Sequence, residues 1–455
     1  MLLGFFLIVF SAMGQQSIMG NFPELAGKEI HLKGFSGFNS YAIDSIKISS
    51  TGDFKLKYTA TNQGIGYLSI ANSKPYFIIL SEEDIQLEGD FLKTPKRIKI
   101  LRGKENKLFN QYIIDHSKRQ QVLQAWHYLQ KRYRKDSLFT IQKTPQQDIA
   151  AEIERIKQSN STFLKNLEFK SYISWYLPVR NLVNSVSKIV KFNREDIHKT
   201  ISEFRKLDYS ADRLFKSGLL KDAIENQFWL IENIGQPIEI VYKEMSISID
   251  SLLESISKDE TKFNRITQHL FKMLEQHSLF QASEYLAVKV LTQNSCTVND
   301  KLAKQLQAYR AMKKGNTAPD INFNGDVFKK GTSIETPSSL SEIGSKYKVV
   351  IFGASWCPKC TEEISQLLPL YQKWKSKGVE VLFVSLDTDK EAFKSFTSIL
   401  PFISTSDYKK WDTKAAKDYY VFATPTIFLL DSNQKILLRP NSVKQLDAWV
   451  EYYIK

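Results

Sequence analysis

The sequence has little cysteine and little histidine. Only three cysteines and six histidines occur in 455 residues, and no histidine pairs with another ligand type at a metal-binding spacing. A structural zinc site needs about four ligands, and no second Cys or His pair is present to supply them. We therefore expect no metal site, and no motif in the chain calls for a cofactor.

Long hydrophobic runs are also missing. Beyond the N-terminus, no segment reaches the roughly 18 consecutive apolar residues of a transmembrane helix, so we expect no transmembrane segment in the mature chain. Residues 2–10 form a shorter apolar run, and the small residues Ala12 and Gly14 follow it. This pattern is typical of a signal peptide, here residues 1–14, cleaved before Gln15.

The signal-peptide interpretation has one competitor, a buried N-terminal strand, because no lysine or arginine precedes the apolar run. A run that begins at Met1 and ends in a small-x-small site favours export. No cysteine follows the run, so we expect no lipid anchor. The predicted location is the periplasm or cell envelope.

The overall composition is that of an ordinary globular protein, with 42% hydrophobic and 25% charged residues. The length suggests about three domains. The formal net charge is +14, and the excess of basic residues lies upstream of about residue 315, scattered along polar helix faces. No nucleic-acid recognition motif accompanies the charge, so we expect a solvated basic surface and no nucleic-acid partner.

Residues 15–103 contain short runs in which apolar and polar side chains alternate. Alternation with a period of two places one set of side chains in a core and the other in water. Residues 50–53, Ser-Thr-Gly-Asp, predict a hairpin turn, because glycine readily adopts positive φ. We predict a small antiparallel β-sandwich without a catalytic constellation. The runs are residues 30–32, 46–48, 54–58, 67–70, 76–80, 85–87 and 98–100.

Residues 104–312 change to a helical pattern, in which apolar residues recur at spacings of three and four, as at Leu108 and Tyr112. Helix starts are indicated by Thr144-Pro145 and by Ser283-Glu284, a capping residue followed by a first-turn acid. We predict an all-helical spacer or small bundle for this stretch.

Residues 313–455 begin with a linker, because Gly315 and Pro319 interrupt the helical pattern. A mixed pattern follows, with strands at 349–352, 379–385, 426–430 and 436–438. Helices are expected at 361–375, 390–399 and 443–453. This order predicts an α/β domain with a mixed central sheet that helices cover on both sides.

The motif Trp356-Cys357-Pro358-Lys359-Cys360 lies between the first of these strands and the first helix. Cys357 is expected at the helix N-terminus, where unpaired N–H groups and the helix dipole stabilise a thiolate. Pro358 suits the first helical position, and Cys360 lies about one turn further on. The thiolate of Cys357 would attack a partner disulfide, and Cys360 would release the reduced partner. An inert pair of cysteines is the competing interpretation.

Four further residues are candidates for the site. Glu363 shares a helix face with Cys360 and can relay a proton, although a first-turn acid favoured by the helix dipole is an equal interpretation. Thr424 and Pro425 open a strand, where the X-Pro bond can be cis and the Thr424 backbone can pair with an extended substrate. An ordinary trans proline is the alternative. Trp356 joins them as a candidate substrate-binding residue.

Cys296 is the third, unpaired cysteine. Free cysteines are usually buried and inert, and this is the favoured interpretation. A transient bridge between Cys296 and the redox pair is the alternative.

On these residues, the segment from about 316 to 455 resembles the thioredoxin-like family that includes TlpA, ResA and the DsbE-type proteins. The resemblance rests on residues 318–320 (Ala-Pro-Asp), the Cys-x-x-Cys motif, Glu363 and residues 424–426 (Thr-Pro-Thr). Residues 16–110 resemble the β-rich module of unknown function often fused ahead of such domains. That similarity rests on residues 44–45, 51–54 and 103–106, and the helical middle is similar to the spacer in those fusions.

The resemblance implies an envelope thiol–disulfide oxidoreductase that usually acts as a reductant. It also implies a cis bond at Thr424–Pro425 and tuning of the cysteines by Glu363. Two positions depart from the family pattern. Ser365 replaces a proline that kinks the helix, and Ile351 replaces the buried aspartate of thioredoxin itself, which leaves Glu363 as the expected proton acceptor.

The sequence therefore predicts an exported enzyme that reduces or exchanges disulfides in cell-envelope proteins. A membrane thiol reductant would recycle its Cys357–Cys360 pair. The alternative is a non-catalytic envelope binding or scaffold protein in which Cys357 and Cys360 form a static disulfide.

Overall fold

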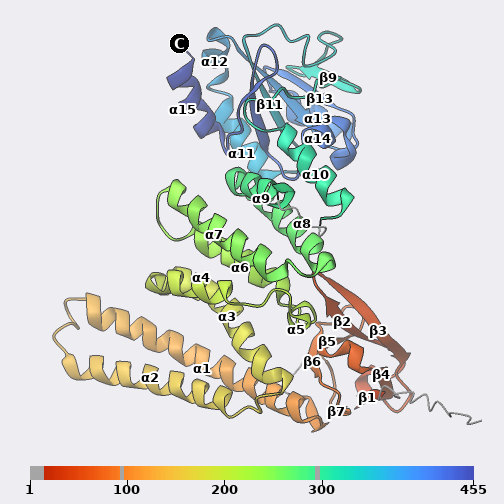
Figure 1. The fold of residues 1–455 in the computed structure, drawn as a ribbon, viewed down its shortest axis with the longest axis vertical. Coiled ribbons are helices and arrows are strands. Elements are labelled where there is room, and N and C mark those ends of the chain that lie inside the picture. Colours follow the sequence, from red (N-terminus) through yellow and green to blue (C-terminus); the bar gives the residue numbers. More distant parts are fainter. Residues whose placement is uncertain (1–14, 93–96, 293–297, 455) are drawn as a thin grey trace, which may run out of the picture. The chain divides into compact units, whose positions relative to one another are not determined.

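The structure is a computed structural model that describes residues 15–92, 97–292 and 298–454. The predicted signal peptide and Cys296 lie outside these residues. The chain divides into two compact units, with the boundary between Gln236 and Pro237. Along the chain, β-strands are followed by helices and then by an α/β domain, so the predicted fold classes are confirmed (Figure 1).

The first unit begins with eight strands in two sheets. The strands are β1 (Gln16–Asn21), β2 (Glu29–Ser36), β3 (Asn39–Lys47), β4 (Asp53–Tyr58), β5 (Gly64–Ser69), β6 (Tyr76–Leu80), β7 (Ile85–Glu88) and β8 (Lys99–Arg102). Their orders are β4-β1-β7-β8 and β3-β2-β5-β6. All the neighbouring pairs are antiparallel except β1 and β7, which run parallel.

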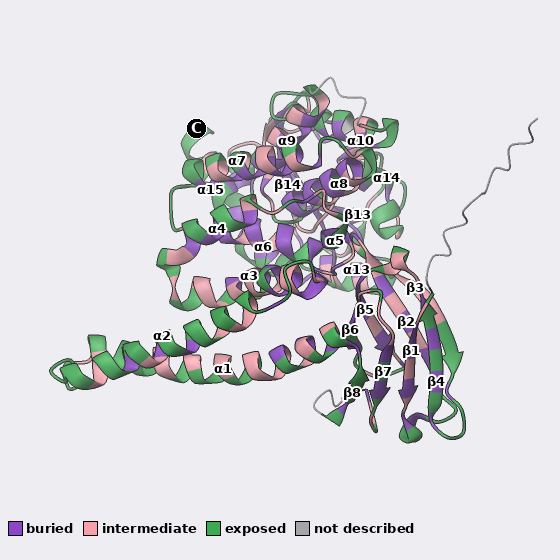
Figure 2. Ribbon diagram, turned by 60° about the horizontal axis from the view of Figure 1, so that its bottom comes forward, coloured by how far each residue is buried: buried purple, intermediate pink, exposed green. Residues whose placement is uncertain are grey.

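The two sheets share one apolar core, as a β-sandwich requires. Ile18 and Leu56 from one sheet and Leu32 and Leu68 from the other belong to the same cluster of buried residues. In β4, buried and exposed residues alternate strictly (Figure 2). This alternation confirms the predicted period of two, and the parallel β1–β7 pair corrects the expectation of a wholly antiparallel sandwich.

Six helices complete the first unit. They are α1 (Lys104–Lys135), α2 (Lys143–Lys165), α3 (Tyr172–Phe192), α4 (Ile197–Arg205), α5 (Asp212–Phe215) and α6 (Leu220–Glu232). The long helices α1 and α2 pack side by side (Figure 1). Their outer turns carry exposed basic residues such as Arg132 and Lys135, as the scattered basic pattern predicts.

The second unit begins with four helices, α7 (Ile238–Ile256), α8 (Glu260–Gln276), α9 (Phe280–Thr292) and α10 (Asp300–Ala311). The expected helix start at Ser283 is wrong, because α9 begins three residues earlier. The Ser283 side chain is instead buried, and its hydroxyl donates a hydrogen bond to the carboxylate of Glu275 on α8. Ser283 therefore ties two helices together and does not cap one.

The α/β domain of the second unit has seven strands in the order β10-β9-β13-β12-β11-β14-β15. The strands are β9 (Asp326–Lys329), β10 (Thr332–Ser333), β11 (Tyr347–Gly353), β12 (Val379–Ser385), β13 (Ile403–Ser406), β14 (Thr426–Asp431) and β15 (Ile436–Leu438). The central strands β11, β12 and β13 are parallel, and the outer pairs are antiparallel. This is the mixed sheet that the sequence predicts.

Helices cover both faces of the sheet. They are α11 (Pro358–Leu367), α12 (Tyr371–Ser376), α13 (Lys390–Thr397), α14 (Lys414–Asp418) and α15 (Val443–Tyr453). Val349 and Ile351 of β11 pack on the face with α11, α12 and α15, whereas Val350 and Phe352 pack on the opposite face. Because both faces of the sheet are buried, the central strands have nearly continuous apolar sequences.

The single helix expected at residues 361–375 is wrong. The structure has two helices there, and Pro369 lies in the turn between α11 and α12. Proline has no N–H to donate to the preceding turn, so the helical hydrogen bonding is interrupted at this position.

A buried ion pair connects helices α8, α9 and α10 to the sheet. Arg439, just after β15, donates a hydrogen bond to Glu275 of α8 over 3.0 Å and another to the Tyr309 hydroxyl of α10 over 3.1 Å. The side chains of Arg439 and Glu275 are only 9% and 2% exposed. The guanidinium also lies 4.0 Å from the ring centre of Phe280 on α9, so one side chain contacts three helices.

Removing one partner of a buried ion pair destabilises a fold far more than replacing both partners with apolar residues, because the remaining charge is buried without a partner. We therefore expect Glu275→Gln to lower the free energy of unfolding by about 3–5 kcal/mol. The double variant Glu275→Leu with Arg439→Met is expected to lose less unfolding free energy, because it leaves no unpaired buried charge. Urea unfolding of the full chain measures both. A single variant at least as stable as the double variant would contradict this view of the ion pair.

Candidate functional site

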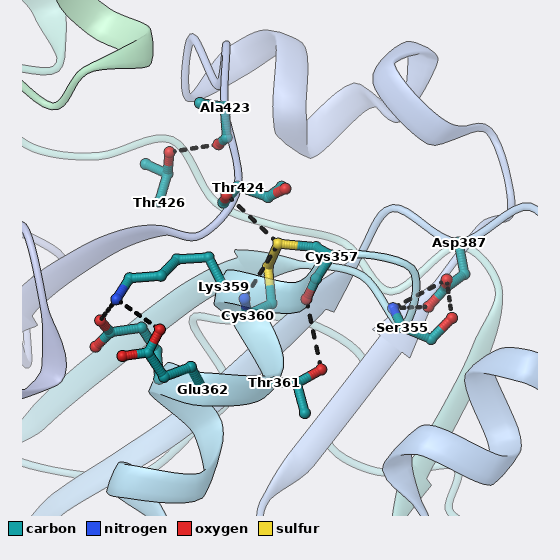
Figure 3. The surroundings of a disulfide bond; sticks show 11 residues. Ser355, Cys357, Lys359, Cys360, Thr361, Glu362, Asp387, Ala423, Thr424 and Thr426 are labelled. Atoms are coloured by element: carbon teal, nitrogen blue, oxygen red, sulfur yellow. Dashed lines mark hydrogen bonds and ion pairs between the residues drawn. A yellow bond between two sulfur atoms is a disulfide. The ribbon is translucent and has the colours of Figure 1, made fainter. Parts of the chain in front are cut away.

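The two cysteines of the motif form a disulfide at the N-terminus of α11 (Figure 3). Cys357 is the N-cap residue, and its Sγ accepts a hydrogen bond from the Cys360 amide over 3.1 Å. Pro358 occupies the first turn, where its missing N–H has no helical partner to lose. Cys357 is 6% exposed and Cys360 only 1%, so Cys357 is the sulfur that a partner reaches first.

Thr424 and Pro425 lie directly against this disulfide. The Thr424 carbonyl oxygen is 3.5 Å from Cys357 Sγ, and the Thr424–Pro425 bond is cis, as the resemblance implies. Figure 3 shows Thr424 above the sulfurs, on the segment that leads into β14. The site is therefore assembled from two segments that are 67 residues apart in the sequence.

Trp356 is 47% exposed beside the disulfide. Its ring packs edge-on against Trp411, with 6.3 Å between the ring centres, and Lys410 Nζ lies 5.3 Å from its ring centre. Trp411 is itself 39% exposed. Large exposed aromatic side chains that cluster together are typical of binding surfaces.

Glu363 is buried, and both of its carboxylate oxygens are engaged. One accepts a hydrogen bond from the Val443 amide at the start of α15 over 2.7 Å, and the other lies 3.2 Å from Lys359 Nζ. Lys359 also contacts Glu362 over 2.9 Å. Hydrogen bonds to Glu362 and Glu363 raise the pKa of the Lys359 ammonium above its usual value. The motif lysine is therefore held by carboxylates on its own helix.

The two departures from the family pattern have simple structural consequences. Ile351 is buried in the apolar cluster that includes Ile364 of α11, so no carboxylate lies at that position. Ser365 donates its hydroxyl to the Glu362 carbonyl within α11, over 2.7 Å. The break in the helix comes four residues later, at Pro369.

Asp387 is a residue of the site that sequence reasoning missed. It is 1% exposed and accepts hydrogen bonds from the Ser355 amide and the Ser355 hydroxyl (Figure 3). It also accepts one from the Ser385 hydroxyl. These bonds fix the chain two residues before Cys357. Asp387 follows β12 at the carboxyl edge of the parallel strands, where polar side chains often form sites, and this placement could have identified it.

Gly353 explains how α11 comes so close to the sheet. A Cβ atom on this residue would lie 2.7 Å from the Phe383 ring and 3.4 Å from Cys360 Sγ. Any larger residue would therefore push against both the core and the buried sulfur.

Two kinds of feature are absent from the part of the chain that the structure describes. Among residues 15–92, 97–292 and 298–454, no three His, Cys, Asp or Glu side chains gather in a way that could hold a metal ion. Within the same ranges, no helix has the length and apolar character to span a membrane.

The comparisons with known proteins find relatives of the α/β domain. A family model described as thioredoxin-like matches residues 344–436, a span that holds the disulfide, Glu363 and the cis proline. Human nucleoredoxin is 29% identical over 122 residues, which cover 26% of this chain and 27% of nucleoredoxin. A thiol-disulfide oxidoreductase ResA of Bacillus cereus is 28% identical over 115 residues, which cover 25% of this chain and 66% of ResA.

A solved structure, the thioredoxin domain of a thiol-disulfide oxidoreductase from Bacteroides vulgatus, is 27% identical. The match covers 31% of this chain and 99% of that domain, with a TM-score of 0.27. The match to nucleoredoxin spans about a quarter of that protein's length. The family match therefore concerns the C-terminal domain, where every candidate site residue lies.

Proposed function

We propose, from the premise that this chain carries a thioredoxin-like domain related to ResA, that the protein is an exported thiol–disulfide oxidoreductase. It reduces disulfides in proteins of the cell envelope. The observation that carries the proposal is the Cys357–Cys360 disulfide at the N-terminus of α11, with the carbonyl of the cis-proline segment 3.5 Å from the outer sulfur. A static disulfide needs neither a helix N-terminus nor a neighbouring backbone that can bind substrate.

The reduced pair acts in two steps. The Cys357 thiolate attacks a sulfur of the substrate disulfide, forms a mixed disulfide and releases one substrate thiolate, which takes up a proton. The Cys360 thiolate then attacks Cys357 Sγ, and the second substrate thiol leaves. The protein pair loses two electrons and ends as the Cys357–Cys360 disulfide. The Cys360 amide, 3.1 Å from Cys357 Sγ, favours the anionic sulfur in the first step.

Trp356, Thr424 and Pro425 bind the substrate chain in this proposal. The Thr424 backbone borders the disulfide at the start of β14, so an extended substrate can pair with it by strand addition. The exposed face of Trp356 gives the substrate an apolar contact beside the attacked sulfur.

Glu363 is proposed to accept the proton of Cys360. Its carboxylate is buried one helical turn from Cys360, the spacing at which two side chains share a helix face. A carboxylate in such a position can assist the second step, in which Cys360 must become a thiolate.

Export is supported by the sequence of residues 1–14 alone. An exported pair works in an oxidising compartment, where disulfides persist, so a reductase there needs a supply of electrons. We therefore propose a membrane thiol reductant as the partner that returns Cys357 and Cys360 to the dithiol form.

Trapping of mixed disulfides tests the proposed function. In a Cys360→Ser variant the second step is blocked, so covalent adducts of the full chain with envelope proteins should accumulate through Cys357. The Cys357→Ser variant is the matched control and should trap nothing. Non-reducing electrophoresis detects the adducts, and dithiothreitol should release them. Absence of adducts, together with no reduction of insulin by the unmodified protein, would favour the scaffold alternative.

The role of Glu363 is tested against its neighbour on α11. Both Glu362 and Glu363 contact Lys359, but their side chains are 57% and 4% exposed. Glu363→Gln keeps an oxygen for the Val443 amide and removes the proton acceptor, so we expect the second step to slow by roughly 100-fold. Glu362→Gln should not slow this step, and equal behaviour of the two variants would contradict the proton role.

A further inference from the structure

A groove of about 620 Å³ lies in the second unit, between α8 and the loop around α14. We call it the α8 groove. Lys272 and Gln276 of α8 form one side, and the other side includes Trp411, Lys417, Tyr420 and Phe422. A helix that precedes the thioredoxin-like domain in sequence therefore supplies one wall of a groove on that domain.

Two residues that line the α8 groove connect it to the redox site. Trp411 packs against Trp356, the residue before Cys357. Phe422 lies two residues before Thr424, whose carbonyl oxygen is 3.5 Å from Cys357 Sγ. A chain bound across the disulfide therefore meets the α8 groove as it leaves the sulfur.

Helix α8 is packed against the segment that leads to Thr424. Phe271 packs at nearly a right angle against Phe422, with 5.9 Å between the ring centres. Glu275 is fixed by the buried ion pair with Arg439. Phe271 and Glu275 lie one turn apart on the buried face, and their neighbours Lys272 and Gln276 lie one turn apart on the exposed face. This wall of the groove is therefore anchored to the buried core through Phe271 and Glu275.

The chemistry of the α8 groove is aromatic and cationic. Lys417 is paired with Asp412 over 2.9 Å. Lys272, by contrast, has no carboxylate partner among the described residues, and neither has Lys410 beside Trp356. A lysine that faces a groove without a partner attracts a carboxylate. Next to exposed aromatic rings, this charge suits a peptide that carries both apolar and acidic side chains.

We infer that the α8 groove selects protein substrates in which acidic and apolar residues flank the reactive cysteine, with Lys272 as a specificity-determining residue. This inference rests on the proposed oxidoreductase function and adds a substrate class to it. The electron transfer is the one described above, in which the protein dithiol becomes a disulfide and the peptide disulfide becomes two thiols. The groove contributes binding and orientation only.

Two synthetic peptides test the inference. Each carries one disulfide and the same apolar residues, and they differ only in having Asp or Lys beside the cysteines. Hydroxyethyl disulfide, which is small and neutral, serves as a third substrate that cannot reach the α8 groove. The pre-reduced full chain is mixed with each in a single turnover, so no further reductant is required, and second-order rate constants are measured.

The unmodified protein should reduce the Asp peptide faster than the Lys peptide, and Lys272→Glu should lower the rate for the Asp peptide by roughly fivefold or more. Added salt should weaken the preference, because exposed charges are screened. The control is Lys301→Glu, an exposed lysine on α10 outside the groove, which should change no rate. Neither variant should alter the rate with hydroxyethyl disulfide.

Equal rates for the two peptides, or the same effect from Lys272→Glu and Lys301→Glu, would overturn the inference while leaving the oxidoreductase function intact. Failure of the pre-reduced protein to reduce any of the three disulfides would overturn the proposed function, and the inference with it.

Discussion

The site depends on one constraint, the placement of a cysteine sulfur at the N-terminus of α11. Strand β11 is held between β12 and β14, so the point at which the chain leaves the sheet is determined by hydrogen bonds on both sides. From there the chain must turn into a helix within a few residues. Gly353 allows the close approach, and Pro358 starts the helix. Cys357 is thereby placed where the unpaired amides of the first turn favour a thiolate.

Much of the α/β domain could be predicted because its elements carry strong local signals. The strands at 379–385 and 436–438 and the helix at 443–453 have the predicted bounds. Strand β13 was missed because three of its four residues carry hydroxyl groups and look polar, although all four are buried. The parallel pairing of β1 with β7 joins segments far apart in the sequence, and no local pattern encodes it.

The candidate site likewise has some residues that could be predicted from local sequence signals and others that could not. The Cys-x-x-Cys motif, Glu363 and the cis proline lie in short segments whose spacing carries chemical meaning. Asp387 and the wall of the α8 groove are recognised only from long-range packing. The ion pair that positions α8, for example, joins Glu275 and Arg439, which are 164 residues apart in the sequence. Periodicity identifies α8 as a helix, but it does not indicate that the helix packs against Phe422, two residues before Thr424. The residues ahead of the thioredoxin-like domain therefore line part of a groove on that domain.

The central claim is that Cys357 and Cys360 form a redox pair that gives electrons to substrate disulfides, and their reduction potential tests it most directly. The full chain would be equilibrated in glutathione or dithiothreitol redox buffers, and the free thiols of Cys357 and Cys360 counted by alkylation. A reductant should have a potential near that of thioredoxin, about −270 mV. A value near about −120 mV, typical of a strong oxidant, would contradict the account.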